Sequence, residues 1–301
     1  MSSVREHLPR LTAALILAAA GTACNMPLSG TAPPAPTPVS TPAPATSALA
    51  AAAPTSPPIA SATPALAATL AATAAGLPPR PARDEAILIL EPGPGSRVTT
   101  PLRVAGIADT TFEQALVVRL VLDDGSLLAL EPTTIQTEMG TRGPFEVDVP
   151  FSLAGERSAL LQVYSASARD GGLTHLSSVG VLLALSGPAD IRPAQAGREQ
   201  LQILQPRLVE RISGGVAHVE GFGLASFEGT LLVQIYDVDG NQVGSQSIIV
   251  QAPEMGVPGP FVADVPYTVT TEGPGRVVVV DPLPAFDGVG HIASVEVILA
   301  P

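Results

Sequence analysis

The chain of 301 residues contains no tryptophan, and Cys24 is its single cysteine. A disulfide framework is therefore excluded, and so is the antibody-type core in which a buried tryptophan packs against an inter-sheet disulfide. Any folded domain in this chain must be held together by aliphatic packing. A domain of about 100 residues is long enough to bury such a core without cross-links.

Positive charge and aromatic side chains are also scarce. The sequence has 15 lysine and arginine residues against 27 aspartate and glutamate residues, which gives a net charge of −12. An acidic surface repels nucleic acid and anionic lipid headgroups, so we exclude nucleic-acid binding. Aromatic residues are 3% of the chain, which weakens the case for a platform that stacks sugars or bases.

Motifs of known catalytic chemistry are missing as well. The sequence contains no Gly-x-Ser-x-Gly, no His-Glu-x-x-His and no glycine-rich phosphate loop. Beyond the N-terminal segment the histidines are His175, His218 and His291, and their spacing is not that of metal ligands. We expect a solvated or structurally satisfied role for each, with no metal, no cofactor and no enzymatic activity.

What the chain does contain is an internal repeat. The segment from Met139 to Phe151 returns from Met255 to Tyr267, with 8 of 13 positions identical and a spacing of 116 residues. This spacing is far above that of solenoid repeats and close to the size of an independent domain. We therefore infer a tandem of two domains, called here the first and the second copy.

Each copy alternates apolar and polar residues with the period of a β-strand. Phe145 begins such a run in the first copy and Phe261 in the second, with Asp148 and Asp264 on the side that faces water. Proline lacks a backbone donor, so the prolines at the ends of these runs indicate an edge strand or a strand end.

Further alternating runs complete each copy. The last strands are expected at Val179 to Leu185 and at Val295 to Leu299. We count about seven or eight short strands per copy and no convincing helix, which predicts an all-β fold with two antiparallel sandwiches.

Asp-Gly pairs follow several of these runs. After alternating apolar residues, Asp124-Gly125 and Asp239-Gly240 predict hairpins with type I′ turns. The segment from Asp237 to Asn241 also has the start of a calcium loop, since carboxylates two residues apart can share one cation. A full loop needs an acidic residue about eight positions later, which is missing, so we favour the hairpin turn.

The N-terminal segment has the layout of a secretory signal. Arg5 and Arg10 precede an apolar run that is too short to span a bilayer as a permanent helix. The small residues before Cys24 resemble the bacterial lipobox, although Gly21 stands where that motif usually has leucine. We predict a signal peptide over residues 1–23 and lipidation of Cys24. Ordinary cleavage that leaves a free thiol is the alternative.

Residues 25–79 carry no charge and consist mainly of alanine, proline, threonine and serine. Such a segment cannot assemble a core, so residues 24–83 are expected to form a disordered tether, semi-rigid where prolines cluster. This tether either lets the protein extend through a cell wall or glycan layer, or serves only as a neutral spacer. The expected domains are residues 84–186 and residues 200–301. A linker over residues 187–199 would allow some relative motion between them.

Short motifs in the first copy carry a family resemblance. They include Ile89-Leu90-Glu91-Pro92, Val104-Ala105-Gly106, Phe112-Glu113 and Gly143-Pro144-Phe145. With them this copy resembles the immunoglobulin-like domain of bacterial spore germination, and the second copy is similar but has drifted. The resemblance implies an immunoglobulin-like sandwich exported to the cell envelope. It implies neither sporulation nor catalytic residues.

These features together predict a non-enzymatic, extracytoplasmic lipoprotein held to the membrane by its lipid or, if the lipid is absent, secreted. Its paired domains would act as a surface binding, adhesion or assembly module for an envelope protein or a glycan. A passive stalk without a ligand is the alternative. A hydrolase whose acidic residues meet only in the fold is a more remote one.

Overall fold

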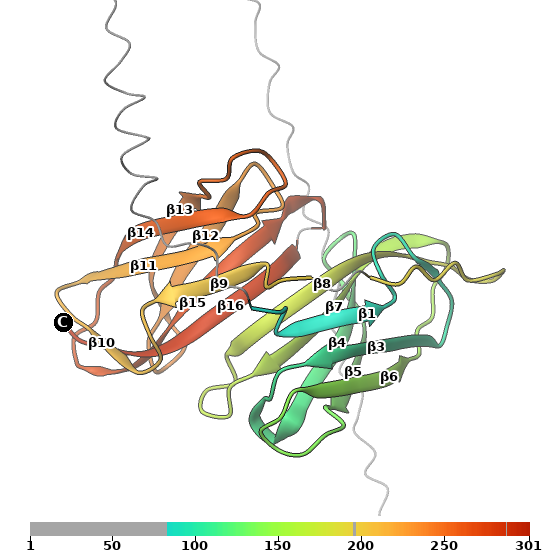
Figure 1. The fold of residues 1–301 in the computed structure, drawn as a ribbon, viewed down its shortest axis with the longest axis horizontal. Coiled ribbons are helices and arrows are strands. Elements are labelled where there is room, and N and C mark those ends of the chain that lie inside the picture. Colours follow the sequence, from blue (N-terminus) through green and yellow to red (C-terminus); the bar gives the residue numbers. More distant parts are fainter. Residues whose placement is uncertain (1–82, 195–196, 287) are drawn as a thin grey trace, which may run out of the picture. The chain divides into compact units, whose positions relative to one another are not determined.

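The computed structural model describes residues 83–194, 197–286 and 288–301 (Figure 1). The predicted signal peptide, Cys24 and nearly all of the predicted tether lie outside the described residues. In the described part the chain is almost entirely β-structure, interrupted by two short 3-10 helices. This confirms the all-β prediction. No helix of the described part is long and apolar enough to cross a membrane.

Eight strands lie in the first copy, which agrees with the expected number. They are β1 (Ile87–Glu91), β2 (Arg97–Val98), β3 (Leu102–Ala108), β4 (Ala115–Leu122), β5 (Leu127–Thr134), β6 (Gly143–Val149), β7 (Arg157–Ala166) and β8 (Leu173–Leu183), with the 3-10 helix η1 (Phe112–Gln114) before β4. Strands β1, β3 and β6 form one sheet, and β5, β4, β7 and β8 run side by side in another. Aliphatic residues from both sheets enclose a single core.

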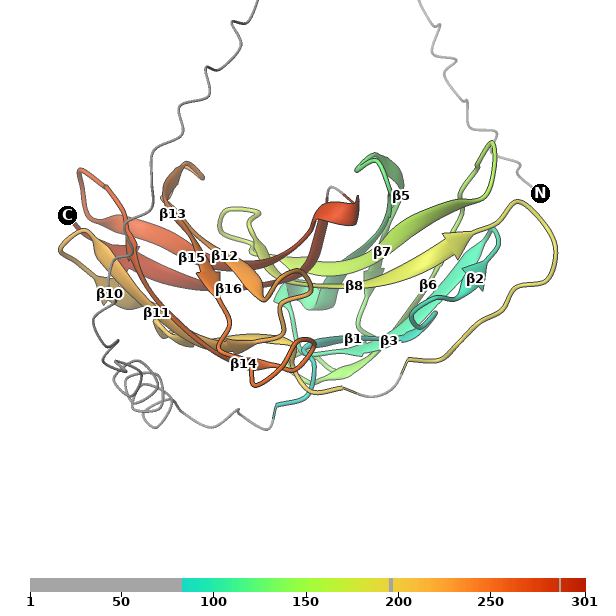
Figure 2. The same cartoon turned by 90° about the horizontal axis from the view of Figure 1, so that it is seen from above.

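The second copy repeats this strand order. Its elements are β9 (Leu201–Gln205), β10 (Glu210–Ile212), β11 (Val216–Gly223), β12 (Thr230–Tyr236), β13 (Gln242–Ile249), β14 (Gly259–Pro266), β15 (Gly273–Leu283), η2 (Pro284–Phe286) and β16 (Gly288–Leu299). Strands β9, β11 and β14 form a three-stranded sheet, and β13, β12, β15 and β16 lie side by side. Figure 2 shows the three-stranded sheet of each copy packed against its larger partner. The second copy also has its own core.

The repeated segment forms β6 and β14, the outer strands of the two three-stranded sheets. Phe145 and Phe261 are at most 1% exposed, whereas Asp148 and Asp264 face water. The first of these strands ends one residue before Pro150, and the second ends at Pro266. The predicted alternation and the predicted edge position are both confirmed.

A glycine lies opposite each of these phenylalanines. Gly106 pairs with Phe145, and Gly221 pairs with Phe261. A Cβ atom would come within 2.5 Å of the Phe145 ring at Gly106 and within 2.1 Å of the Phe261 ring at Gly221. The ring therefore fills the space that a side chain would need, which explains why both copies have glycine here.

The Asp-Gly hairpins form where expected, between β4 and β5 and between β12 and β13. Their turn type differs from the prediction. Gly125 and Gly240 adopt positive φ (77° and 78°), but Asp124 and Asp239 are not among the positive-φ residues of the described chain. The predicted type I′ turns are therefore wrong. The hydrogen bonds from Gly125 N to Leu122 O and from Gly240 N to Asp237 O fit a type I turn followed by a left-handed glycine and a bulge.

The two copies are joined by pairing of β8 with β16, where Leu176 lies opposite Ile292. Ten strands thereby belong to one sheet. Both strands begin several residues before the expected starts at Val179 and Val295, and the added residues are the ones that pair across the junction. The domain boundaries and the relative motion of the domains stay predictions.

Candidate functional site at the junction of the copies

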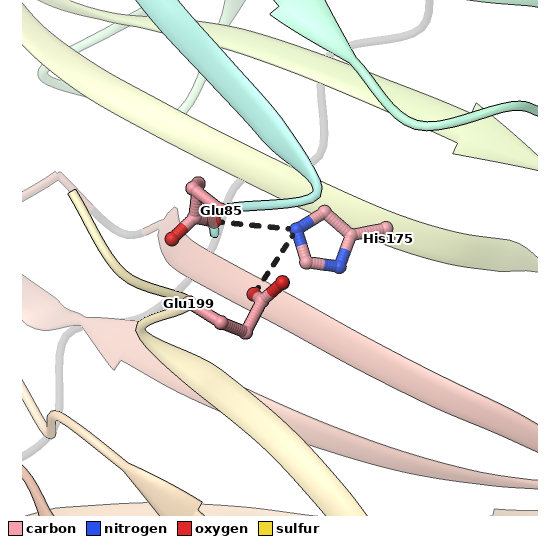
Figure 3. Close-up of side chains that lie close together, drawn as sticks. All are labelled: Glu85, His175 and Glu199. Atoms are coloured by element: carbon pink, nitrogen blue, oxygen red, sulfur yellow. Dashed lines mark hydrogen bonds and ion pairs between the residues drawn. The ribbon is translucent and has the colours of Figure 1, made fainter. Parts of the chain in front are cut away.

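Three titratable side chains meet where the copies join (Figure 3). Glu85 precedes β1, His175 lies in β8, and Glu199 precedes β9. The Nε2 atom of His175 lies 3.4 Å from Oε1 of Glu85 and 3.6 Å from Oε1 of Glu199. Each residue offers one ligand atom, and the three atoms lie within 4.8 Å of one another. Glu85 and Glu199 are only 4% and 5% exposed.

The segment that leads into β1 pairs through its backbone with the segment that leads into β9. This pairing holds Glu85 and Glu199 in place. The amide of Glu85 donates to the carbonyl of Gly197 at 3.2 Å, and the amide of Glu199 donates to the carbonyl of Arg83 at 2.9 Å. The Oε2 atom of Glu85 accepts from the amide of Gln200, and Oε2 of Glu199 accepts from the amide of Ala86, both at 2.9 Å. One oxygen of each carboxylate is therefore fixed by the opposite segment, and the other is near His175.

These contacts are reciprocal. Glu85 and Glu199 are 114 residues apart, the same spacing as Ile89 and Ile203 of the repeat. Each glutamate accepts from the amide that follows the other glutamate. Contacts in which two equivalent surfaces exchange the same partners are typical of a two-fold interface. The junction is thus a two-fold contact made within one chain.

His291 is the counterpart of His175, 116 residues further along. It is 7% exposed, and its Nδ1 atom lies 3.9 Å from Oδ2 of Asp281. That carboxylate already accepts from the amide and the hydroxyl of Ser226. Within the described residues, Nδ1 of His291 has no hydrogen-bond partner.

The pKa values of the two glutamates are shifted in opposite directions. Burial works against ionisation of Glu85, but the hydrogen bond to His175, the charges of His291 and His175 and the amide of Gln200 together lower its pKa. Burial raises the pKa of Glu199, and the nearby charge of Glu85 adds to this effect. The cluster is therefore suited to holding a cation or a shared proton.

The cluster does not have the geometry of a nucleophilic triad. Ser177 donates its hydroxyl to Oε1 of Glu85 at 3.0 Å and lies 3.5 Å from Nε2 of His175. In a triad the histidine stands between serine and acid and uses both ring nitrogens. Here the same nitrogen faces the serine and both acids, and Ser177 is 4% exposed.

A cleft of about 660 Å³ adjoins the cluster on one side. Its lining includes Arg83 and Phe112 from the first copy and Glu296 from the second, together with His175 and Glu199. A second cavity, of about 370 Å³, is lined by Glu85, Ser177, Gln200 and His291. Both volumes lie in or near the range of ligand sites in proteins.

A buried arginine adds a second polar contact between the copies. Arg276 of β15, 4% exposed, donates to Asp170 Oδ1 at 2.6 Å and to Glu296 Oε1 at 3.0 Å. Burial opposes ionisation of Asp170, but the amide of Gly172 and Arg276 outweigh it and lower its pKa to about 2. Asp170 also lies in a turn, in which the amide of Gly171 donates to the carbonyl of Ser167.

The remaining sequence candidates do not form a site. His218 is exposed, with Asp264 on Nδ1 at 2.7 Å and Glu220 on Nε2 at 2.8 Å, so the two carboxylates lie on opposite sides of the ring. This agrees with the solvated role predicted for His218. Asp237 accepts from the amides of Asp239 and Asn241 within its turn, as expected for the hairpin rather than the calcium loop. Cys24 lies outside the described residues.

Comparison with known proteins supports the fold of the first copy. Residues 86–172 match the sequence model of the immunoglobulin-like domain of bacterial spore germination, which confirms the resemblance there. A domain of this family indicates a β-sandwich module of an extracellular or envelope protein. Membership of the second copy in the family stays a prediction. No curated protein matches the chain.

Two solved structures show weak likeness. Dimeric latent PorU from Porphyromonas gingivalis is 10% identical, with a TM-score of 0.22 and coverage of 72% of this chain and 24% of that chain. Bovine butyrophilin is 11% identical, with a TM-score of 0.21 and coverage of 70% and 97%. The chain thus spans about a quarter of the PorU chain.

Proposed function

We propose that this protein is a non-enzymatic lipoprotein of the cell envelope whose two sandwiches together form a binding module. The cleft beside Glu199 and His175 carries the proposal, because residues from both copies line it. Such a site forms only where the two domains meet, so a single domain could not provide it.

The chemistry of the lining supports a polar partner with an apolar edge. Arg83, Asp109, Thr110 and Thr111 offer charged and hydroxyl groups, and Phe112 is 60% exposed beside them. Aromatic residues that are exposed next to polar groups are frequent anchors at protein interfaces. An envelope protein or a glycan fits this description.

One observation favours binding over catalysis. The hydroxyl of Ser177 is buried, and it shares one nitrogen of His175 with both acids, so the three groups do not form the relay of a nucleophilic triad. A hydrolase with an acidic site is therefore the weaker alternative.

Attachment to the membrane is proposed through Cys24. The thiol follows a short apolar run and small residues, in the manner of a bacterial lipobox. Residues 25–79 would then separate the sandwiches from the membrane.

Phe112 gives a direct test, because Phe227 occupies the matching place in the second copy. Phe227 is 45% exposed and does not line the cleft. A photoreactive phenylalanine analogue is placed at position 112 or at position 227 of the full chain in intact cells, and crosslinked products are identified by mass spectrometry. A product formed from position 112 and absent from position 227 supports the binding module. No product, or the same products from both positions, would instead favour the passive stalk.

A further inference from the structure

We propose that Glu85, His175 and Glu199 bind a divalent transition-metal ion, for which Zn²⁺ is the best fit, at the junction of the two copies. The inference does not depend on whether the cleft binds a partner. It rests on the positions of donor atoms that come from three distant parts of the sequence.

The distances between donor atoms match those around zinc. Zinc binds imidazole nitrogen and carboxylate oxygen at about 2.0–2.2 Å in tetrahedral geometry, which puts neighbouring ligand atoms about 3.4 Å apart. The Nε2 atom of His175 lies 3.4 Å from Oε1 of Glu85 and 3.6 Å from Oε1 of Glu199. The remaining pair, Oε1 of Glu85 and Oε1 of Glu199, lies within 4.8 Å, so one ion can reach all three donor atoms.

The carboxylates are already oriented as metal ligands usually are. The Oε2 atoms of Glu85 and Glu199 accept backbone hydrogen bonds from Gln200 and Ala86, which leaves the Oε1 atoms facing His175. Ser177 adds a hydrogen bond to Oε1 of Glu85. Supporting contacts of this kind fix the direction of ligand atoms and strengthen metal binding.

Charge balance also favours a cation. Glu85 and Glu199 are both more than nine-tenths buried, and the guanidinium Nε of Arg83 is 4.0 Å from Glu199. Placing two carboxylates so close together in a buried site is costly unless positive charge compensates them. A divalent ion bound between His175 and the two Oε1 atoms would supply this charge at the place where the carboxylates come closest to each other.

His291 places a second buried imidazole close to Glu85. It is more than nine-tenths buried and lines the same cavity as Glu85, and its Nδ1 atom has no hydrogen-bond partner within the described residues. That nitrogen lies 3.9 Å from Oδ2 of Asp281, so His291 is a second imidazole beside the site and is not one of the three ligands.

The donor set selects among metals. One nitrogen and two oxygen donors suit zinc, while calcium and magnesium prefer six or more oxygen ligands. Three protein ligands leave a fourth position on the ion, as in zinc sites that keep an open place for water or a ligand.

The first measurement uses the unchanged full chain, purified without a histidine tag and stripped of metal with a chelator. Equilibrium dialysis against Zn²⁺ followed by elemental analysis should give one ion per chain, with a raised melting temperature. Mg²⁺ at the same concentration should leave the melting temperature unchanged. With Co²⁺ the protein should show the intense visible absorption of a four-coordinate ion. Absence of stoichiometric zinc would overturn the proposal without any variant.

Variants then locate the ion. His175→Ala and Glu199→Gln should lose the stoichiometric zinc and the melting shift. Ser177→Ala should weaken binding by about 10–100-fold through loss of a supporting hydrogen bond. The matched control is His218→Ala, because His218 also has two acidic neighbours but holds them on opposite ring nitrogens.

Circular dichroism of the metal-free variants verifies that each is folded. If zinc survives both His175→Ala and Glu199→Gln, or disappears in His218→Ala, the site is elsewhere and the proposal fails. Zinc lost from the first two variants and kept by the third is the supporting result. In the failing cases, the three residues hold the copies together without a metal ion.

Discussion

Leu176 and Ile292 occupy equivalent places in the two copies and lie directly opposite each other where β8 pairs with β16. They are 0% and 7% exposed and belong, with Val278 and Val280, to a small apolar cluster that is separate from the two main cores. The two copies therefore share both backbone hydrogen bonds and buried apolar surface. We expect them to unfold as one cooperative unit.

Replacing Leu176 with alanine should test this coupling. The loss of a buried side chain at the centre of the junction should lower the free energy of unfolding by roughly 2–5 kcal/mol. Urea unfolding followed by circular dichroism should show one transition in the unchanged protein and an earlier one in the variant. Leu130→Ala is the control, because Leu130 is 47% exposed. Two separate transitions in the unchanged protein would contradict the coupling.

A methyl group at Gly221 should be poorly tolerated. Its Cβ would come within 2.1 Å of Phe261, so Gly221→Ala should force the ring to move and cost about 1–3 kcal/mol of stability. At Gly180 a Cβ would meet no atom within 4 Å, and Gly180→Ala should change stability by less than about 0.5 kcal/mol. Equal effects of the two substitutions in thermal unfolding would show that the ring is not the cause.

The ion pair between Asp170 and Arg276 should make the free energy of unfolding depend on pH. Asp170 has its pKa lowered from 3.8 to about 2, so the folded state favours the ionised carboxylate. The stabilisation is fully present above pH 3.8 and is lost as the pH falls through about 2. Asp170→Asn should therefore cost about 1–2 kcal/mol at pH 7.

The difference between Asp170→Asn and the unchanged protein should shrink as unfolding is measured at successively lower pH. Asp124 is a useful comparison, since its pKa is also lowered to about 2, but its partners, Ser126 in the same turn and Arg157 at the start of β7, are exposed. Asp124→Asn should have the smaller effect at pH 7. A cost for Asp170→Asn that does not change with pH would rule out the ion pair as its source.

Substitution of Cys24 tests the proposed anchor. If the thiol carries the lipid, Cys24→Ala should move the protein from the membrane fraction to the medium, because the apolar attachment is lost. Fractionation of cells that express either form, followed by immunoblotting, measures this. An unchanged membrane fraction for Cys24→Ala would argue against lipidation.

Much of the fold could be predicted from the sequence. The alternation that begins at Phe145 predicted a half-buried strand, and the structure confirms both its buried and its exposed face. The turn type after Asp124 could not be predicted as well, because aspartate and glycine suit several turns and the bulge depends on how neighbouring strands twist.

The candidate site was harder to foresee. Glu85, His175 and Glu199 are 90 and 24 residues apart along the chain, so no metal-binding motif contains them. A signal was nevertheless present, since Glu85 recurs as Glu199 and His175 recurs as His291 at repeat spacing. Polar residues repeated at matching places indicate a contact between copies when the copies meet around a two-fold axis.

The pairing of β8 with β16 also bears on aggregation. In a single sandwich each of these strands would be an edge strand of its larger sheet. Its unpaired backbone groups could then pair with a strand of another molecule. Here the N-terminal part of each strand pairs with the other copy. The C-terminal parts pair with short strands of their own copy: Leu182 of β8 lies opposite β2, and Val297 of β16 lies opposite β10. A sandwich produced alone would expose this backbone, and we expect it to form dimers or larger aggregates through these strands.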